Sequence, residues 1–324
     1  MNELMPRSFM PQEDQGYFTV ELELPDGATI ERTRVVTDRA MAYLLEQPEV
    51  EHVLNVTGSS PRVGTNQSRS QLTVILKPSD EHKGRDLSAL MADVMAELST
   101  YPESKVYLSR PAVIPGLGSS GGFEMALEAR GNTTYAELQA AVDTLLTAAS
   151  KSKELSGVSS SMQRDIPQLY FDVDRDKAQL QGVNMSDIFS TVKAFTGSVY
   201  VNDFNMFNRI YRVYIQAEAP YRAHRENLNL YFVKGRDGTM LPVTSLGKTS
   251  YTTGAGNIKR FNMFNSAMIT GEAAHGYSSG QAMSKMEQLV KETLGDKVEV
   301  EWSGLSYQEK NEDGNTGLVL LLAF

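Results

Sequence analysis

The side chains that most often carry out chemistry are scarce in this 324-residue chain. It has no cysteine, and its four histidines, His52, His82, His224 and His275, are far apart in the sequence. Zinc sites and metalloprotease helices need closely spaced ligands, and disulfides and cysteine nucleophiles need thiols. The sequence therefore predicts no metal centre and no cysteine chemistry.

Two short segments resemble ligand-binding loops but lack part of the required pattern. The glycine-rich run 116–122 precedes a predicted strand, whereas a dinucleotide-binding loop lies between a strand and a helix. Asp172, Asp174 and Asp176 lack the glycine and the distal glutamate of a calcium loop. We expect the first segment to be a flexible hinge and the second to lead from a strand into the first turn of a helix.

Methionine is the remaining candidate ligand, with 15 residues. Its thioether binds soft ions such as Cu(I) and Ag(I), so export of these metals stays an alternative function. Several methionines, however, fall on the apolar positions of predicted helices and strands, which favours core packing. Because neither a cofactor motif nor a coherent nucleophile and base is present, we predict no catalytic residue, no cofactor and no enzymatic activity.

The composition is that of a folded protein with more than one domain. Hydrophobic residues make up 41% of the chain and charged residues 22%, and the net charge is −9. A single core rarely grows beyond about 250–300 residues, so the length favours two or more domains. The negative charge argues against a nucleic-acid partner, because phosphates require a basic surface.

A strand–helix–strand unit occurs four times along the chain. In each copy, alternating apolar and polar residues predict a strand, and apolar residues spaced by three or four predict an amphipathic helix. The copies are predicted at strand 17–24, helix 29–47 and strand 52–57; at strand 71–77, helix 86–99 and strand 105–109; at strand 123–129, helix 134–150 and strand 156–161; and at strand 266–273, helix 279–294 and strand 297–302.

Two such units side by side form a ferredoxin-like split βαβ sandwich (βαββαβ). We therefore predict an α+β fold with two such sandwiches, the second interrupted by an inserted α+β module. The gap between the third and fourth copies is too long for a bare loop and contains strand-like runs at 198–201, 210–216 and 228–233. The predicted parts are a first subdomain at 15–115, the first half of a second at 116–181, the insertion at 182–258 and the second half at 259–310.

The segment Thr57–Ser70 is small, polar and glycine-bearing. This composition is typical of an exposed connection. A solvated hairpin tip and a mobile loop between the strands at 52–57 and 71–77 are both compatible with it.

The last residues, 317–324, form an unbroken apolar run. The run is far shorter than the roughly 20 residues that span a bilayer. A terminal strand and a truncated transmembrane helix are both compatible with it, and an acidic chain that ends in aliphatic residues favours the helix.

Five strings in a fixed order carry a family resemblance. They are Phe9-Met-Pro-Gln-Glu-Asp-Gln-Gly16, Leu24-Pro-Asp-Gly-Ala-Thr29, Tyr200-Val-Asn-Asp-Phe204, Gly271-Glu-Ala-Ala274 and Trp302-Ser-Gly-Leu-Ser-Tyr-Gln-Glu309. Together they closely resemble the second large periplasmic loop of resistance-nodulation-division efflux transporters, in the branch that exports hydrophobic and amphiphilic drugs. The resemblance covers essentially the whole chain.

This resemblance implies a part of a proton-driven antiporter of the Gram-negative inner membrane that works as a homotrimer. The chain would hold the two C-terminal porter subdomains, and the insertion at 182–258 would be a docking subdomain facing a periplasmic adaptor (membrane fusion) protein and an outer-membrane channel protein. Residues 1–14 would link to a preceding membrane helix, and 311–324 would begin a truncated transmembrane helix. The proton carriers would lie outside this chain.

The resemblance also implies where amphiphilic small-molecule substrates bind. Leu54, Val56 and Thr73 correspond to walls of a deep pocket, Glu21 and Glu23 to an outer entrance, and Tyr107 and Ser109 to an outer-pocket strand. A gate loop between the two pockets corresponds to Gly58, Ser59, Ser60, Pro61, Arg62, Val63 and Gly64.

This sequence departs from the family pattern in its aromatic residues. Drug pumps of this branch often carry aromatic side chains in the gate loop and at the Thr73 position, where this chain has Ser59, Pro61 and Thr73. Fewer stacking contacts are therefore expected in the pocket. The alternatives to a drug pump are the heavy-metal (Cu/Ag) branch of the family and a stand-alone periplasmic binding module.

Overall fold

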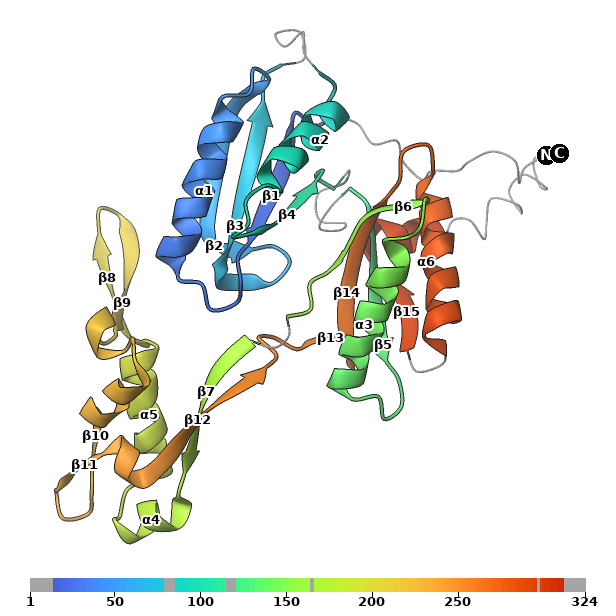
Figure 1. Cartoon of the computed structure of the whole chain (residues 1–324). Coiled ribbons are helices and arrows are strands. Elements are labelled where there is room, and N and C mark those ends of the chain that lie inside the picture. The colour runs from blue at the N-terminus through green and yellow to red at the C-terminus, as the bar shows by residue number, and fades with distance from the viewer. Residues whose placement is uncertain are drawn as a thin grey trace. The chain divides into compact units, whose positions relative to one another are not determined.

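The computed structural model describes residues 14–78, 85–112, 114, 121–163, 166–295 and 298–311. These residues form two compact units, coloured along the chain in Figure 1. One unit comprises the described residues up to Ile166 together with those from Ala255 onward, and the other comprises Pro167–Gly254. The first unit contains two α/β sandwiches with separate hydrophobic cores.

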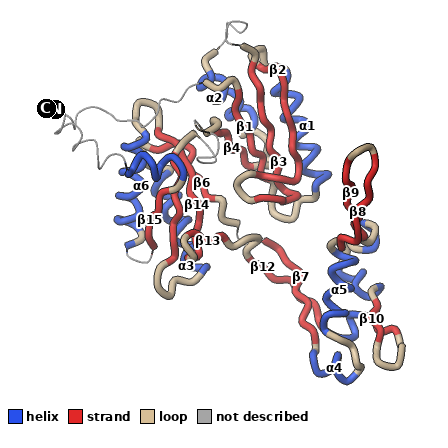
Figure 2. The backbone as a smooth tube through the Cα atoms, turned by 180° about the vertical axis from the view of Figure 1, so that it is seen from behind, coloured by secondary structure: helices blue, strands red, loops and turns tan. Residues whose placement is uncertain are grey.

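The first sandwich is a four-stranded antiparallel sheet with two helices on one face (Figure 2). Its strand order, β2-β3-β1-β4, is that of a ferredoxin-like βαββαβ fold. The elements are β1 (Tyr17–Glu23), α1 (Ile30–Leu45), β2 (Val50–Ser60), β3 (Gly64–Leu76), α2 (Leu87–Leu98) and β4 (Lys105–Ser109).

Alternation in β1 separates the two faces of this sheet. Phe18, Val20 and Leu22 are fully buried and pack in the core with apolar residues of α1 and α2. Both helices begin at a side-chain cap, because the Thr29 hydroxyl accepts from the backbone N–H of Arg32 and the Asp86 carboxylate from that of Ala89. Neither helix of this sandwich covers the opposite face of the sheet (Figure 2).

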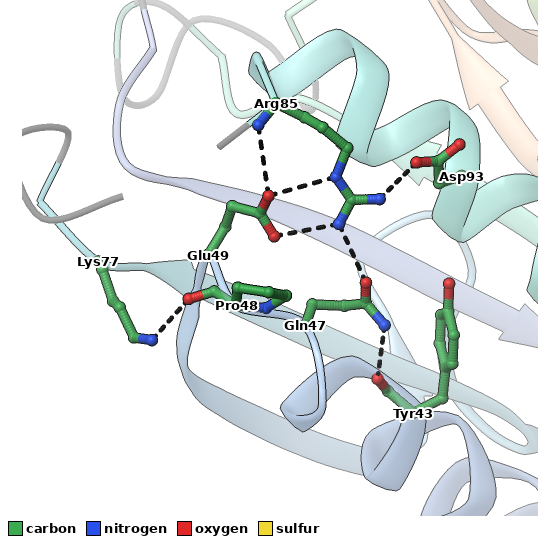
Figure 3. A network of polar contacts seen from close by, with 7 residues as sticks. All are labelled: Tyr43, Gln47, Pro48, Glu49, Lys77, Arg85 and Asp93. Atoms are coloured by element: carbon green, nitrogen blue, oxygen red, sulfur yellow. Dashed lines mark hydrogen bonds and ion pairs between the residues drawn. The ribbon is translucent and has the colours of Figure 1, made fainter. Parts of the chain in front are cut away.

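A polar clamp joins the start of β2 to the start of α2 (Figure 3). The guanidinium of Arg85 donates to both carboxylate oxygens of Glu49, at 3.2 and 3.1 Å, and to the side-chain oxygen of Gln47 at 3.1 Å. Arg85 also forms an ion pair with Asp93. Glu49 is buried, and its hydrogen bonds with Arg85 lower the pKa of its carboxyl group.

Of the two interpretations of Thr57–Ser70, the hairpin is confirmed and the mobile loop is wrong. β2 continues to Ser60 and β3 begins at Gly64, so the segment is a paired hairpin whose turn is 61–63. These parts of the two strands show no apolar alternation in the sequence, because the buried residues are polar. Ser60, Ser68, Arg69 and Ser70 are all buried.

The second sandwich repeats the topology of the first. Its sheet contains the path β14-β5-β15, and β6 pairs with β14, so the order β6-β14-β5-β15 matches β2-β3-β1-β4. A short extra strand, β13, also pairs with β14. The elements are β5 (Phe123–Ala129), α3 (Tyr135–Ala149), β6 (Leu155–Ser160), β13 (Lys259–Phe261), β14 (Phe264–Ala273), α6 (Ser279–Thr293) and β15 (Val298–Trp302).

Both helices of the second sandwich begin with a capping box, at Thr134 and Glu137 and at Ser278 and Gln281. Their apolar faces cover Met125, Leu127 and Ile269 of the sheet. The predicted fold class, α+β with two ferredoxin-like sandwiches and an insertion in the second, is thereby confirmed.

The inserted unit, Pro167–Gly254, has its own core, which includes Val183, Ile188, Tyr231 and Val243. It starts earlier in the chain than the predicted 182–258, because β7 and β12 pair with each other at its two ends. Its elements are β7 (Ile166–Val173), α4 (Arg175–Leu180), α5 (Met185–Thr196), β8 (Val199–Met206), β9 (Arg209–Ile215), β10 (Phe232–Lys234), β11 (Met240–Pro242) and β12 (Gly247–Gly254), with 3₁₀ turns at Ala219–Tyr221, Arg225–Leu230 and Val243–Leu246.

Two local predictions in this unit have different outcomes. The aspartate run does lead from a strand into a helix, because the Asp174 carboxylate caps α4 by accepting from the backbone N–H of Lys177. The predicted strand at 228–233 is wrong over its first half, which is a 3₁₀ turn. Leu228 and Tyr231 are both buried, and their spacing of three fits the period of a 3₁₀ helix.

No helix among the described residues is long and apolar enough to cross a membrane. The predicted linker (apart from Asp14), the predicted transmembrane start beyond residue 311 and most of the predicted hinge at 116–122 lie outside the described residues.

Candidate functional site

The helix-free face of the first sheet collects half of the residues that the family resemblance selected. On β1, Thr19, Glu21 and Glu23 alternate with the core residues and therefore point to this face. Residues directly opposite one another on antiparallel strands share a face. The strand register therefore places further side chains beside them.

Three rows cross the sheet on this face. The first contains Leu54, Thr73, Thr19 and Ser109; the second Val56, Gln71, Glu21 and Tyr107; and the third Arg69, Glu23 and Lys105. Seven of the predicted site residues, from four strands, thus lie on one surface.

Polar contacts fix the side chains of this surface. The hydroxyls of Thr19 and Ser109 lie 2.8 Å apart. Ser60 donates to the Glu21 carboxylate at 2.6 Å, and both residues are buried. Arg69, also buried, forms an ion pair with Glu23. Two of the carboxylates on this face are therefore held by neighbours from the β2–β3 hairpin.

A cavity of about 410 Å³ adjoins one end of this face. Of the predicted site residues, Glu21, Glu23, Arg62, Val63 and Tyr107 line it. The other predicted residues do not line it, namely Leu54, Val56, Gly58, Ser59, Ser60, Pro61, Gly64, Thr73 and Ser109.

Sequence reasoning missed the rest of the lining. Asp26, Arg69 and Lys105 come from the first sandwich, and the opposite wall comes from the second: Gln139, Val142, Leu146, Val158, Ser159, Ser160, Ser161, Met162 and Gln163. Arg69 and Lys105 could have been found by pairing each with Glu23 across neighbouring strands. The second-sandwich wall leaves no signal in the sequence, because it meets the first only in the tertiary structure.

The turn of the β2–β3 hairpin, residues 61–63, bridges the two walls. The Arg62 guanidinium lies 4.5 Å from the centre of the Tyr107 ring and donates to the Ser159 hydroxyl and the Ser160 carbonyl, each at 3.0 Å. The backbone carbonyls of the turn also accept hydrogen bonds, that of Arg62 from the Lys259 ammonium at 2.6 Å and that of Val63 from the Asn257 amide at 3.4 Å.

Burial perturbs three ionisable groups around the cavity. It raises the pKa of the Asp26 carboxyl above 3.8, an effect that Arg69 opposes and Glu23 reinforces. It also raises the pKa of Tyr107, with the Glu23 charge acting in the same direction. Burial lowers the pKa of the Lys259 ammonium, which Glu124 opposes and Arg62 reinforces.

The arrangement is suited to binding. Charged and hydroxyl groups line one part of the cavity and aliphatic side chains another. In the part of the chain that the structure describes, no group of three histidine, aspartate or glutamate side chains is placed to hold a metal ion.

Comparison with known proteins gives the chain a family. The sequence model of the AcrB/AcrD/AcrF family matches residues 1–324. The chain is 35% identical over 309 residues to the toluene efflux pump membrane transporter TtgB of Pseudomonas putida, an alignment that covers 94% of this chain and 29% of TtgB.

Two relatives from Escherichia coli K12 have similar sequence identity to this chain and similar coverage. Identity is 36% over 309 residues with the multidrug resistance protein MdtF, covering 94% of this chain and 30% of MdtF. It is 34% over 326 residues with the multidrug export protein AcrF, covering 99% of this chain and 31% of AcrF. The chain spans about three-tenths of the length of these relatives. It belongs to the AcrB/AcrD/AcrF family, the resistance-nodulation-division efflux transporters whose motifs its sequence resembles.

Proposed function

We propose that this chain is the periplasmic, substrate-binding and conduit part of a proton-driven multidrug efflux pump that exports amphiphilic small molecules. The observation that carries the proposal is the common face of the first sheet. Residues chosen by family resemblance, and scattered from Glu21 to Ser109, lie in adjoining rows there and continue into a cavity with polar and aliphatic walls. Such a surface suits a ligand with one polar and one apolar end.

The same proposal assigns roles to the remaining parts. The two sandwiches act as porter subdomains, and Pro167–Gly254 acts as the docking subdomain for a periplasmic adaptor and an outer-membrane channel in a homotrimeric pump. Its β8–β9 hairpin supports this role, because it exposes Phe204, Phe207 and Tyr214. Exposed apolar groups of this kind are typical of protein interaction sites.

A steric block on the sheet face tests the substrate-binding role. Leu54 is 59% exposed, so Leu54→Trp adds bulk to the face without disturbing the core. In a pump-deletion strain that carries the full-length transporter, we expect this substitution to change resistance to at least one amphiphilic compound severalfold. Leu45→Trp is the matched control, because Leu45 is 50% exposed at the end of α1, outside the cavity lining.

A backbone block tests the hairpin turn. Gly64 has φ +83°, which proline cannot adopt, so Gly64→Pro disrupts the turn that carries Arg62 and Val63. We expect reduced export with an unchanged level of transporter in the membrane. Unchanged resistance to a broad panel of compounds in both Leu54→Trp and Gly64→Pro would refute the proposed binding face.

A further inference from the structure

Three groups that contact the Arg62 guanidinium are of kinds that recognise a cation. The Tyr107 ring offers the negative face of its π system, and the Ser159 hydroxyl and the Ser160 carbonyl offer oxygen acceptors. We call Tyr107, Ser159 and Ser160 the cation seat.

Acidic side chains lie near the cation seat. Glu21, Glu23 and Asp26 line the same cavity, whose basic residues are Arg62, Arg69 and Lys105. Arg69 is already paired with Glu23. Among the lining residues, three carboxylates then face two basic side chains once Arg62 leaves. The Lys259 ammonium, which bonds to the Arg62 backbone carbonyl, adds one positive charge beside the cavity. The departure of Arg62 therefore removes the excess positive charge that would repel another cation.

Arg62 can leave the seat without releasing the hairpin. Lys259 and Asn257 hold the turn through the backbone carbonyls of Arg62 and Val63, and these bonds do not involve the Arg62 side chain. The seat also satisfies that side chain incompletely, since the buried Nε of Arg62 has no hydrogen-bond partner among the described residues. A buried donor without a partner weakens the closed arrangement.

We propose that Arg62 is an intramolecular ligand of the cation seat and that an organic cation on an apolar body competes with it. The ammonium or guanidinium of such a ligand takes the place of Arg62 over Tyr107. The aliphatic part of the ligand contacts Val142, Leu146 and Val158 on the facing wall. The assignment of this ligand as a transported compound rests on the proposed function, whereas the seat itself rests only on the geometry of the cavity.

Three probes with the same eight-carbon tail and different head groups test the proposal. Octylguanidinium is cationic, octyl glucoside neutral and octyl sulfate anionic. Each is titrated below its micelle concentration into the full 324-residue chain, and the dissociation constant is measured by calorimetry. The variants are Arg62→Gln, Arg62→Lys and Lys105→Gln, with circular dichroism to verify that each retains the fold.

Lys105→Gln is the decisive control, because it removes one positive charge from the same cavity without emptying the seat. We expect Arg62→Gln to tighten octylguanidinium binding about threefold to thirtyfold, the range of one desolvated cation–π contact. Arg62→Lys, which keeps a cation to compete for the ring, stays close to the wild type, and Lys105→Gln changes binding much less than Arg62→Gln. Adding Tyr107→Leu to Arg62→Gln abolishes the gain.

Two results would overturn the proposal. Equal gains in Arg62→Gln and Lys105→Gln mean that only the net charge of the cavity matters. An equal gain for octyl glucoside in Arg62→Gln means that the substitution merely enlarges the cavity. Failure here is separable from failure of the proposed function, because resistance conferred by the full-length transporter with Leu54→Trp does not depend on the seat.

Discussion

At the scale of single residues, the cavity contains a carboxylate whose charge is unfavourable for the folded state. Asp26 Oδ1 is buried and has no hydrogen-bond partner among the described residues. Burial raises the pKa of this carboxyl above 3.8, so the folded state holds the proton more tightly than the unfolded state. Stability therefore falls as the pH rises from 3.8 through the folded pKa.

Because the pKa of Asp26 is raised in the folded state, we expect Asp26→Asn to stabilise the protein at neutral pH. The amide carries no charge to desolvate. The residue as a whole is only half-buried, so the gain stays at or below roughly 1 kcal/mol. The gain should shrink in acid, where Asp26 is protonated in the wild type. Urea denaturation at neutral and acidic pH measures both effects. Asp38→Asn serves as the control, since Asp38 is exposed and its pair with Arg34 contributes little. A loss of stability at neutral pH would contradict the assignment.

At the scale of elements, the polar clamp of Figure 3 fixes the start of α2 to the turn before β2. Glu49 accepts two bonds from the Arg85 guanidinium and lies in the protein interior. Its pKa is lowered below 4.5, chiefly by these bonds. The stabilising contribution of Glu49 is therefore full above pH 4.5 and is lost as the pH falls through the folded pKa.

We expect Glu49→Gln to destabilise the chain by about 1–3 kcal/mol at neutral pH. The substitution removes the negative charge and one of the two oxygen acceptors that the Arg85 guanidinium contacts. The difference from the wild type should narrow in acid, because protonated Glu49 no longer attracts Arg85 by its charge. Glu51→Gln is the matched control: Glu51 lies two residues along the chain, in β2, and its side chain is 47% exposed. Thermal unfolding followed at several pH values distinguishes the two variants. An equal effect of both substitutions would show that the contacts between Glu49 and Arg85 do not stabilise the fold.

At the scale of the whole molecule, the separate cores indicate that the inserted unit and the rest of the chain can fold independently. Pro167–Gly254 has a core of its own, and its two ends are joined by the pairing of β7 with β12. Paired ends make such a unit separable from its host.

Replacing Pro167–Gly254 by a short glycine-serine linker should therefore leave the remaining unit folded. Its unfolding midpoint should stay within a few degrees of the corresponding transition of the full chain, because neither hydrophobic core of the two sandwiches includes a residue of the insertion. Differential scanning calorimetry of both proteins gives the comparison. Loss of the cooperative transition after replacement would show that the insertion is required for the fold.

The sequence by itself determined the main helices and strands of the two sandwiches and their order. Period-2 alternation at Phe18, Val20 and Leu22, and cap residues such as Thr134, act within a few residues of the chain, so they can be recognised locally. The same local patterns repeat four times, which was sufficient to predict two ferredoxin-like sandwiches and an insertion. The family motifs then selected side chains for the binding face.

Only the tertiary structure decided which of those side chains share a cavity. The full extent of strand pairing over 57–70 could not be predicted, because Arg69 is buried by pairing with Glu23 of β1 and burial of a polar side chain depends on such partners. In the same way, Arg62 meets Ser159 and Ser160 across nearly one hundred residues of sequence. Contacts between surfaces of two separately folded sandwiches leave no periodicity in either segment, so no local pattern could have revealed them.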